Sequence, residues 1–361
     1  MTARRFPDAP STVEIDARYA IRSLVFAEGA KQVLSGGGER KLRRWRVNDG
    51  GEVGEPIQSG GIAIYATALS PDGKWLVCGL KPVSPNDGKA NVEVWNAQTH
   101  QKVFDIRDHK NTVYSVDISA DSTTFATGSR DRTAFIWSMT TGEQLVGPLR
   151  HGGWVVAVHF SPNGDHRIAT TAVTKDWKTT SVRIYNSDSG QLLLDLPSNI
   201  SESASSASLA WSADARQLFV ALDGEVESFD ASSGSSLSKW SIPGGYPIFI
   251  ALAHNQKFIV VSTCMSVTFW DTSTHKQIGT TLKHTSTILS TALSSNDDHV
   301  AVGEKNGKVT LMNPRDILPG ANSSVNVSDP THIKVGEFNK SCLSSVFLSY
   351  RECSNTKNSL I

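Results

Sequence analysis

Residues 109–137 read HKNTVYSVDISADSTTFATGSRDRTAFIW, and the rest of the chain repeats this stretch. It holds three short alternating runs of apolar and polar residues, at 113–119, 125–129 and 133–137, separated by turns rich in Asp, Ser and Arg. Period-two alternation over about 4–8 residues, bounded by such turns, indicates half-buried antiparallel strands.

The same pattern occurs seven times along the 361 residues. A small residue ends the first run of each unit, and successive markers are 41 to 51 residues apart. A period of about 40–45 residues is typical of a four-stranded propeller blade. The sequence therefore predicts an all-β, seven-bladed β-propeller of four-stranded antiparallel blades. The markers are Ala27, Ser70, Ser119, Ser161, Ser212, Ala253 and Ser294.

A second marker, the large side chain that ends each third run, supports this register. These residues are Trp45, Trp95, Trp137, Tyr185, Phe229, Trp270 and Met312. Their distance from the first marker is 17 or 18 residues in five units, and two units have insertions at residues 81–90 and 173–180. Insertions confined to one loop position indicate a fixed scaffold with variable loops.

The ends of the chain determine how the ring closes. We expect an N-terminal arm at residues 1–11, a propeller at 12–316, and a linker with a possible extra strand and a poorly ordered tail at 317–361. The fourth strand of unit seven can come from residues 12–16, or from HIKVGEF at 332–338. Closure by the N-terminal strand is the favoured alternative.

Composition narrows the class of protein. Lys plus Arg and Asp plus Glu number 35 each, and this zero net charge makes a nucleic-acid partner unlikely, because phosphate binding needs a basic excess. The start, MTARRFPDAP, has no apolar signal core, and no apolar run approaches the ~18 residues of a membrane span. The few cysteines favour a reduced compartment without a disulfide framework. We therefore expect a cytoplasmic or nuclear protein with no membrane contact.

Several motifs together resemble the WD-repeat β-propeller family. They are LSPDG (69–73), FSPNG (160–164), the Trp270–Asp271 pair, and the His, Ser-Arg-Asp and Trp series of unit three, and the resemblance covers roughly residues 12–313. It implies a structural tetrad of buried hydrogen bonds, which only unit three matches in full, with His109, Thr127, Asp131 and Trp137. His151 and His284 occupy the His position in two other units, where the partners are missing. Unit three is thus the expected stability anchor of the ring.

Chemistry-bearing motifs are scarce. The His109–Asp131 pair could be mistaken for a catalytic dyad, but the resemblance makes it structural, and no G-x-S-x-G elbow or P-loop occurs. The histidines and cysteines show no metal-ligand spacing. We expect no catalytic residue, no metal and no cofactor. Two alternatives remain: a propeller enzyme (hydrolase or dehydrogenase) with a site in the central channel, and an RNA-binding face, for which the basic run RKLRRWR (40–46) is the candidate.

The resemblance also implies that residues at the start of each first strand, and just before the turn Asp, surround the channel on the top face. Tyr, Trp and Arg are enriched in protein–protein hot spots. The sequence thus predicts a non-catalytic scaffold, a monomeric propeller within a complex, that binds a peptide or partner domain of unknown identity. By position, the candidate residues are Arg22, Tyr65, Tyr114, Arg130, Trp154, Val156, Tyr246, Ile248, Leu289 and Lys305.

Overall fold

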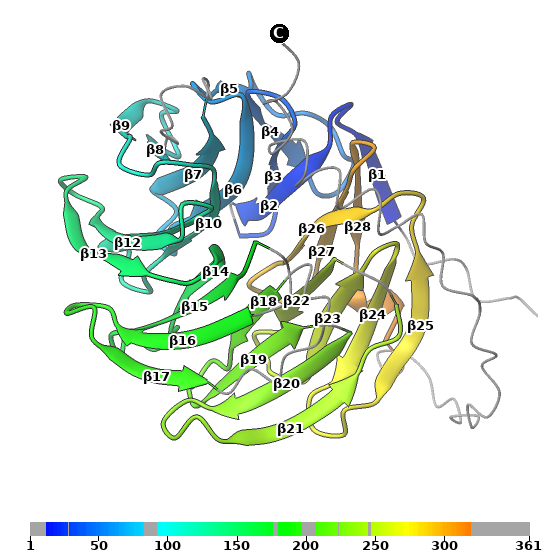
Figure 1. Ribbon diagram of the computed structural model, residues 1–361. Coiled ribbons are helices and arrows are strands. Elements are labelled where there is room, and N and C mark those ends of the chain that lie inside the picture. The colour runs from blue at the N-terminus through cyan, green and yellow to red at the C-terminus, as the bar shows by residue number, and fades with distance from the viewer. Residues whose placement is uncertain are drawn as a thin grey trace, which may run out of the picture.

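Seven four-stranded antiparallel sheets surround a common centre in the computed structural model (Figure 1). The structure describes residues 12–27, 29–82, 92–175, 180–196, 207–222, 224–244 and 247–318. Within these residues there are 28 strands and one short 3-10 turn, Pro314–Asp316. The first strands β2, β6, β10, β14, β18, β22 and β26 contact one another in an unbroken ring. The predicted seven-bladed propeller is confirmed.

Blades one to four contain the following strands. Blade one has β2 (Ile21–Ala27), β3 (Gln32–Gly37), β4 (Lys41–Arg46) and β5 (Ile57–Gln58); blade two has β6 (Ala63–Leu69), β7 (Trp75–Lys81), β8 (Val92–Asn96) and β9 (Lys102–Ile106). Blade three has β10 (Val113–Ile118), β11 (Thr124–Ser129), β12 (Thr133–Ser138) and β13 (Gln144–Arg150); blade four has β14 (Trp154–Phe160), β15 (Arg167–Val173), β16 (Thr180–Asn186) and β17 (Leu192–Leu196).

Blades five to seven complete the ring. Blade five has β18 (Ala207–Trp211), β19 (Gln217–Leu222), β20 (Glu225–Asp230) and β21 (Ser236–Ser241); blade six has β22 (Ile248–Leu252), β23 (Phe258–Thr263), β24 (Ser266–Asp271) and β25 (Gln277–Lys283). Blade seven has β26 (Ile288–Leu293), β27 (Val300–Glu304), β28 (Lys308–Met312) and β1 (Thr12–Asp16).

The ring is closed by the N-terminal strand. β1 pairs antiparallel with β28, from Thr12 opposite Met312 to Asp16 opposite Lys308, and Figure 1 shows the two strands side by side. N-terminal closure is thereby confirmed, and the alternative segment, residues 332–338, lies outside the described residues. The expected arm at 1–11 and most of the expected linker and tail also lie outside them.

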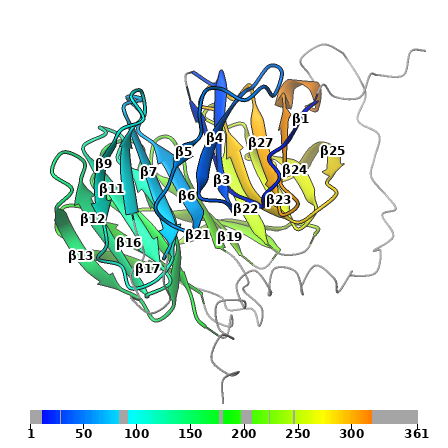
Figure 2. The ribbon, with the colours of Figure 1, turned by 90° about the horizontal axis from the view of Figure 1, so that it is seen from above.

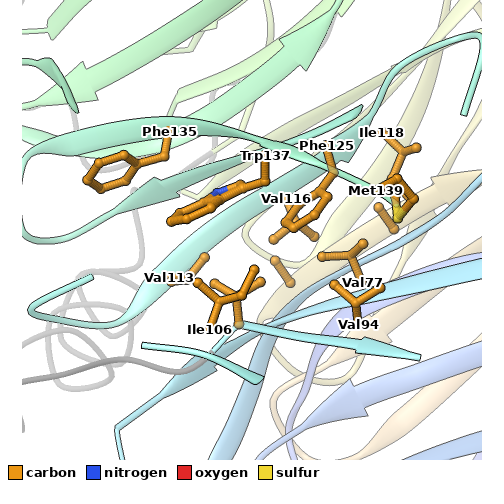
Figure 3. Packing of buried hydrophobic residues seen from close by; sticks show 13 residues of the cluster. Val77, Val94, Ile106, Val113, Val116, Ile118, Phe125, Phe135, Trp137 and Met139 are labelled. Carbon is orange, nitrogen blue, oxygen red and sulfur yellow. The ribbon is translucent and has the colours of Figure 1, made fainter. Parts of the chain in front are cut away.

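The hydrophobic core lies between the blades. Each described core cluster combines residues of two neighbouring blades, and seven such clusters follow the ring. Figure 3 shows the cluster between blades two and three, where Val77, Val94 and Ile106 face Trp137 and Phe125. Viewed from the side, the strands of each blade run across the thickness of the disc (Figure 2). Because the blades bury their apolar faces only against each other, the ring forms one packed unit.

Two details differ from the sequence expectation. The run VGEPIQ at 53–58 predicts the fourth strand of blade one. In the structure this strand is reduced to β5, because Gly54 has a left-handed φ of 63° and Pro56 has no N–H to donate. Cys78 is a free buried thiol, whereas Cys264 is disulfide-bonded, a bond that the expectation of no disulfide framework did not include.

Residues 83–90 of the first predicted insertion and residues 176–179 of the second lie outside the described ranges. Among the described residues, no helix is long and apolar enough to cross a membrane.

Candidate functional site

The first strands of five blades contain a β-bulge near their starts. The pairing register shifts at a single extra residue in β2, β6, β10, β14 and β26. A bulge re-aims the side chain of the extra residue and is frequent next to functional sites. The extra residues are Arg22, Tyr65, Tyr114, Val156 and Leu289, and all five are half-buried. Five of the predicted top-face positions thus coincide with a backbone irregularity that the sequence pattern did not indicate.

Three of these bulge residues form a continuous row over blades one to three. The guanidinium carbon of Arg22 lies 4.5 Å from the centroid of the Tyr65 ring. The Tyr65 and Tyr114 rings are 5.7 Å apart and tilted by 51°. A guanidinium over an aromatic face is attracted by the ring quadrupole, so this row holds its cation in place without a carboxylate.

A second cation–aromatic pair joins blades three and four. The guanidinium carbon of Arg130 lies 4.7 Å from the centroid of the Trp154 ring. The backbone N–H of Arg130 donates to the carbonyl of Thr112 at 2.9 Å, which fixes the turn beside the start of β10. Arg22, Tyr65 and Tyr114 therefore form one group, and Arg130 and Trp154 form a second, on the face where the first strands begin. We call these five residues the Arg-aromatic row.

The other candidates are placed differently. Ile248 is 1% exposed and its strand β22 has no bulge, so its side chain belongs to the core rather than to the surface. Lys305 is half-buried, and its N–H donates to the carbonyl of Thr287 at 2.8 Å. Tyr246 lies outside the described residues. The structure thus brings five of the ten positions into two contacting groups and removes Ile248 from the surface.

The four residues of the tetrad lie in one hydrogen-bonded series. Asp131 Oδ2 is 2.9 Å from Nδ1 of His109, and Nε2 of His109 is 2.7 Å from Oγ1 of Thr127. The indole N–H of Trp137 donates to the same Oγ1 at 2.9 Å. Burial works to raise the pKa of Asp131, but the hydrogen bond and charge of His109 outweigh it, so this pKa lies below its usual value.

A second histidine–carboxylate pair, in blade seven, corrects the expectation that His284 lacks partners. His284 Nδ1 lies 3.1 Å from Oε1 of Glu304, which is 0% exposed, and the other carboxylate oxygen accepts from Thr285 Oγ1 and from the Ser286 N–H. The acid ends strand β27 two residues before Asn306, where a turn Asp was sought. In the sequence, the Glu that follows Gly303 at the end of a strand was the signal that could have identified this partner of His284. Blade three is therefore not the only blade with an acid-paired histidine.

His151 in blade four is less well satisfied. Its Nε2 lies 3.5 Å from Oγ1 of Thr170, and its Nδ1 is buried with no hydrogen-bond partner. Burial, together with the nearby charge of Arg183, lowers the pKa of His151 to about 4. This histidine is consequently held in its neutral form at neutral pH.

The described residues contain no group of three or more His, Cys, Asp or Glu side chains that could hold a metal ion. In the first strands, Asp117 Oδ2 lies 3.8 Å from His159 Nδ1 and accepts the Phe160 N–H at 2.7 Å. Oγ of Ser115 accepts the Val158 N–H at 3.1 Å. These side chains join blades three and four, which is a structural use of groups that could otherwise suggest catalysis.

The basic run at 40–46 is mostly strand β4. Its Arg43 lies between Glu39 and Glu52, at 2.6 and 2.7 Å, and these two carboxylates raise the pKa of Arg43 above its usual value. A guanidinium already paired with two acids is a poor phosphate ligand, so the run has the contacts of an ordinary third strand.

Comparison with known proteins matches a repeat model and several curated proteins over parts of the chain. The family model described as WD domain, G-beta repeat matches residues 100–138. The chain is 31% identical over 147 residues to small ribosomal subunit protein RACK1y of Oryza sativa subsp. japonica, covering 39% of this chain and 41% of that protein. It is 34% identical over 158 residues to apoptotic protease-activating factor 1 of Homo sapiens, covering 43% and 11%, respectively. It is 34% identical over 79 residues to protein SPA1-RELATED 3 of Arabidopsis thaliana, covering 22% and 9%. The chain thus spans less than half of each of these relatives.

Proposed function

We propose that this WD-repeat β-propeller is a non-catalytic scaffold that binds a peptide or partner domain on its top face. The observation that supports the proposal is the Arg-aromatic row: Arg22, Tyr65, Tyr114, Arg130 and Trp154, contributed by four successive blades. Aromatic and Arg side chains held rigidly at a surface lose little entropy on binding and make large contacts. The chain would act as a single propeller within a larger complex.

The two alternative functions, a propeller enzyme and an RNA-binding face, are supported by fewer observations. WD-repeat propellers generally act as scaffolds, and within the described residues the buried acids and histidines are used in hydrogen bonds inside or between blades. An RNA-binding face would draw on the basic run at 40–46, whose Arg43 is already paired with two carboxylates. We therefore assign the top face to protein binding.

A pull-down from cells that contain the native protein tests this proposal. The bait is the full chain, either wild type or carrying Arg130→Glu and Trp154→Ala together. Arg216→Glu is the matched control, because Arg216 is 85% exposed and lies in the turn between β18 and β19, on the opposite face. We expect the double variant to lose a partner that the wild type and the control retain. An unchanged set of partners would show that the top face is not the binding surface.

A further inference from the structure

We infer that the segment bound by the Arg-aromatic row is an acidic peptide, whose carboxylates pair with Arg22 and Arg130 while its apolar side chains pack on the aromatic rings. This inference rests on the proposed function and adds the chemical class of the partner. It follows from how the two guanidinium groups are held, and from the charge of the loops around them.

The guanidinium groups of Arg22 and Arg130 lie against aromatic rings, and their N–H donors are available to a partner. Each has its face on an aromatic ring, Arg22 on Tyr65 and Arg130 on Trp154, at 4.5 and 4.7 Å. A contact with the face of an aromatic ring does not occupy the N–H donors of the group with an oxygen acceptor. Neither side chain has an ion pair or a hydrogen bond with any residue in the described part of the chain. A planar fork of this kind fits a carboxylate through two parallel hydrogen bonds.

Most carboxylates of the same face already accept a hydrogen bond from a histidine or pair with another arginine. Asp131 accepts from His109, Glu304 from His284, and Glu39 is paired with Arg43. Each of these acids is thereby unable to neutralise the arginines of the row. In the described loops of this face, Asp108 is an exposed carboxylate without such a bond.

The cations of this face, by contrast, extend into solvent. Arg18, Lys110 and Arg132 are exposed on the loops that precede β2 and β10 and on the turn after β11. None of the three has an ion pair within the described ranges. In its described loops the top face is therefore locally basic, although the whole chain has zero net charge. Such a local excess steers and selects a partner of opposite charge.

A peptide fits this surface better than a nucleic acid. RNA affinity requires many phosphate contacts, whereas the row positions two guanidinium groups and surrounds them with Tyr65, Tyr114 and Trp154, which are half-buried. The half-buried rings offer apolar contact between the charges. An acidic segment with interspersed aromatic or aliphatic residues satisfies both kinds of contact.

A display library of random twelve-residue peptides tests the inference with the full-length wild-type chain as the target. We expect the enriched peptides to have a net negative charge. A synthetic peptide from that pool should bind at least tenfold more weakly to a chain with Arg22→Gln and Arg130→Gln, measured by fluorescence anisotropy. Arg216→Gln, on the opposite face, should bind like wild type. Equal thermal midpoints of the three chains would show that the loss is not due to unfolding.

Three outcomes would overturn the inference. One is a neutral or basic enriched pool, or no enrichment; another is an acidic peptide that binds the double Gln variant as well as the wild type. The third is a twelve-nucleotide oligouridine that binds more tightly than the peptide and depends on the same arginines. If the pull-down still loses its partner with Arg130→Glu and Trp154→Ala, only the acidic character of the partner is wrong. If both experiments fail, the top-face assignment itself is wrong.

Discussion

At the scale of single residues, one position on the second strand of blades one to three decides whether the tryptophan indole of the blade finds a partner. Ser35 accepts the indole N–H of Trp45 at 2.8 Å in blade one, and Thr127 accepts that of Trp137 at 2.9 Å in blade three. In blade two the same position is Cys78, and the indole nitrogen of Trp95 is buried without a hydrogen-bond partner. An unsatisfied buried donor has a free-energy cost, so this blade has a defect that one hydroxyl could repair.

Replacing Cys78 with Thr should therefore stabilise the protein relative to Cys78→Val. The two side chains have the same shape, but only Thr has a hydroxyl, whose oxygen can accept the indole N–H of Trp95 and whose O–H can donate to the unpartnered Oε2 of Glu93. In an ordinary core Val would be the more stable; here we expect Thr to exceed Val by about 1 kcal/mol in the free energy of unfolding, measured by urea denaturation. A result in which Val is the more stable variant would refute the proposed hydrogen bond.

His284→Ala should be costly although its blade lacks the Trp of the tetrad. Removing His284 takes away the partner of Glu304, an acid that is 0% exposed, so we expect a loss of roughly 1–3 kcal/mol by denaturant titration. Adding Glu304→Gln should recover part of the loss, because a neutral amide is easier to bury than a charge. A cost near zero, or no recovery in the double variant, would contradict this account. From the sequence alone, His109→Ala is expected to cost more than His284→Ala.

At the scale of elements, periodicity was sufficient to predict the strands but not their irregularities. Alternation in 113–119 follows from which side chains face the neighbouring blades, and this determines the position of β10 within one residue. The bulge at Tyr114 leaves no trace in the period-two pattern, because the extra residue is itself a plausible strand residue. Five of the residues chosen by family position lie at such bulges, whereas Ile248, in a strand without a bulge, is buried. The acid of blade seven was missed because it lies on the strand rather than in the turn.

Blade four should make the stability of the protein sensitive to mild acid. His151 has a pKa of about 4 in the folded state and about 6.5 when unfolded, so between these values the unfolded state binds more protons. Its contribution is complete above pH 6.5 and is lost as the pH falls toward 4, amounting to about 3 kcal/mol at most.

The test of this contribution is a comparison of urea midpoints at pH 7.5 and pH 5. His151→Phe keeps a ring against Tyr185 but cannot titrate, so the drop in midpoint between the two pH values should be smaller than in wild type. His166→Phe is the control, because His166 is 64% exposed at its side chain and should leave the drop unchanged. Equal drops in wild type and His151→Phe would show that His151 does not titrate as described.

At the scale of the whole molecule, the ring is stabilised in the same way at all seven junctions, and one of these depends on a strand from the other end of the chain. The junction between blades seven and one contains Ile15 of β1, which is 4% exposed and packs with Val309, Leu311 and Trp45. β1 also covers the edge of β28 with a ladder of five residue pairs. Without β1, blade seven would present an unpaired edge, and the junction would lose part of its core.

Removing β1 should therefore destabilise the complete ring and not only blade seven. We expect a chain lacking residues 1–16 to unfold at a lower temperature than wild type, and to associate through the exposed edge of β28, as measured by calorimetry and light scattering. A chain lacking only residues 1–11 keeps β1 and is the matched control. Ile15→Ala, which keeps the ladder, should cost about 2–4 kcal/mol, whereas Leu145→Ala, at a side chain that is 54% exposed, should cost much less. Because each blade is buried only against its neighbours, opening one junction leaves both adjoining blades half-covered. Identical midpoints for the two truncated chains would show that β1 does not close the ring in solution.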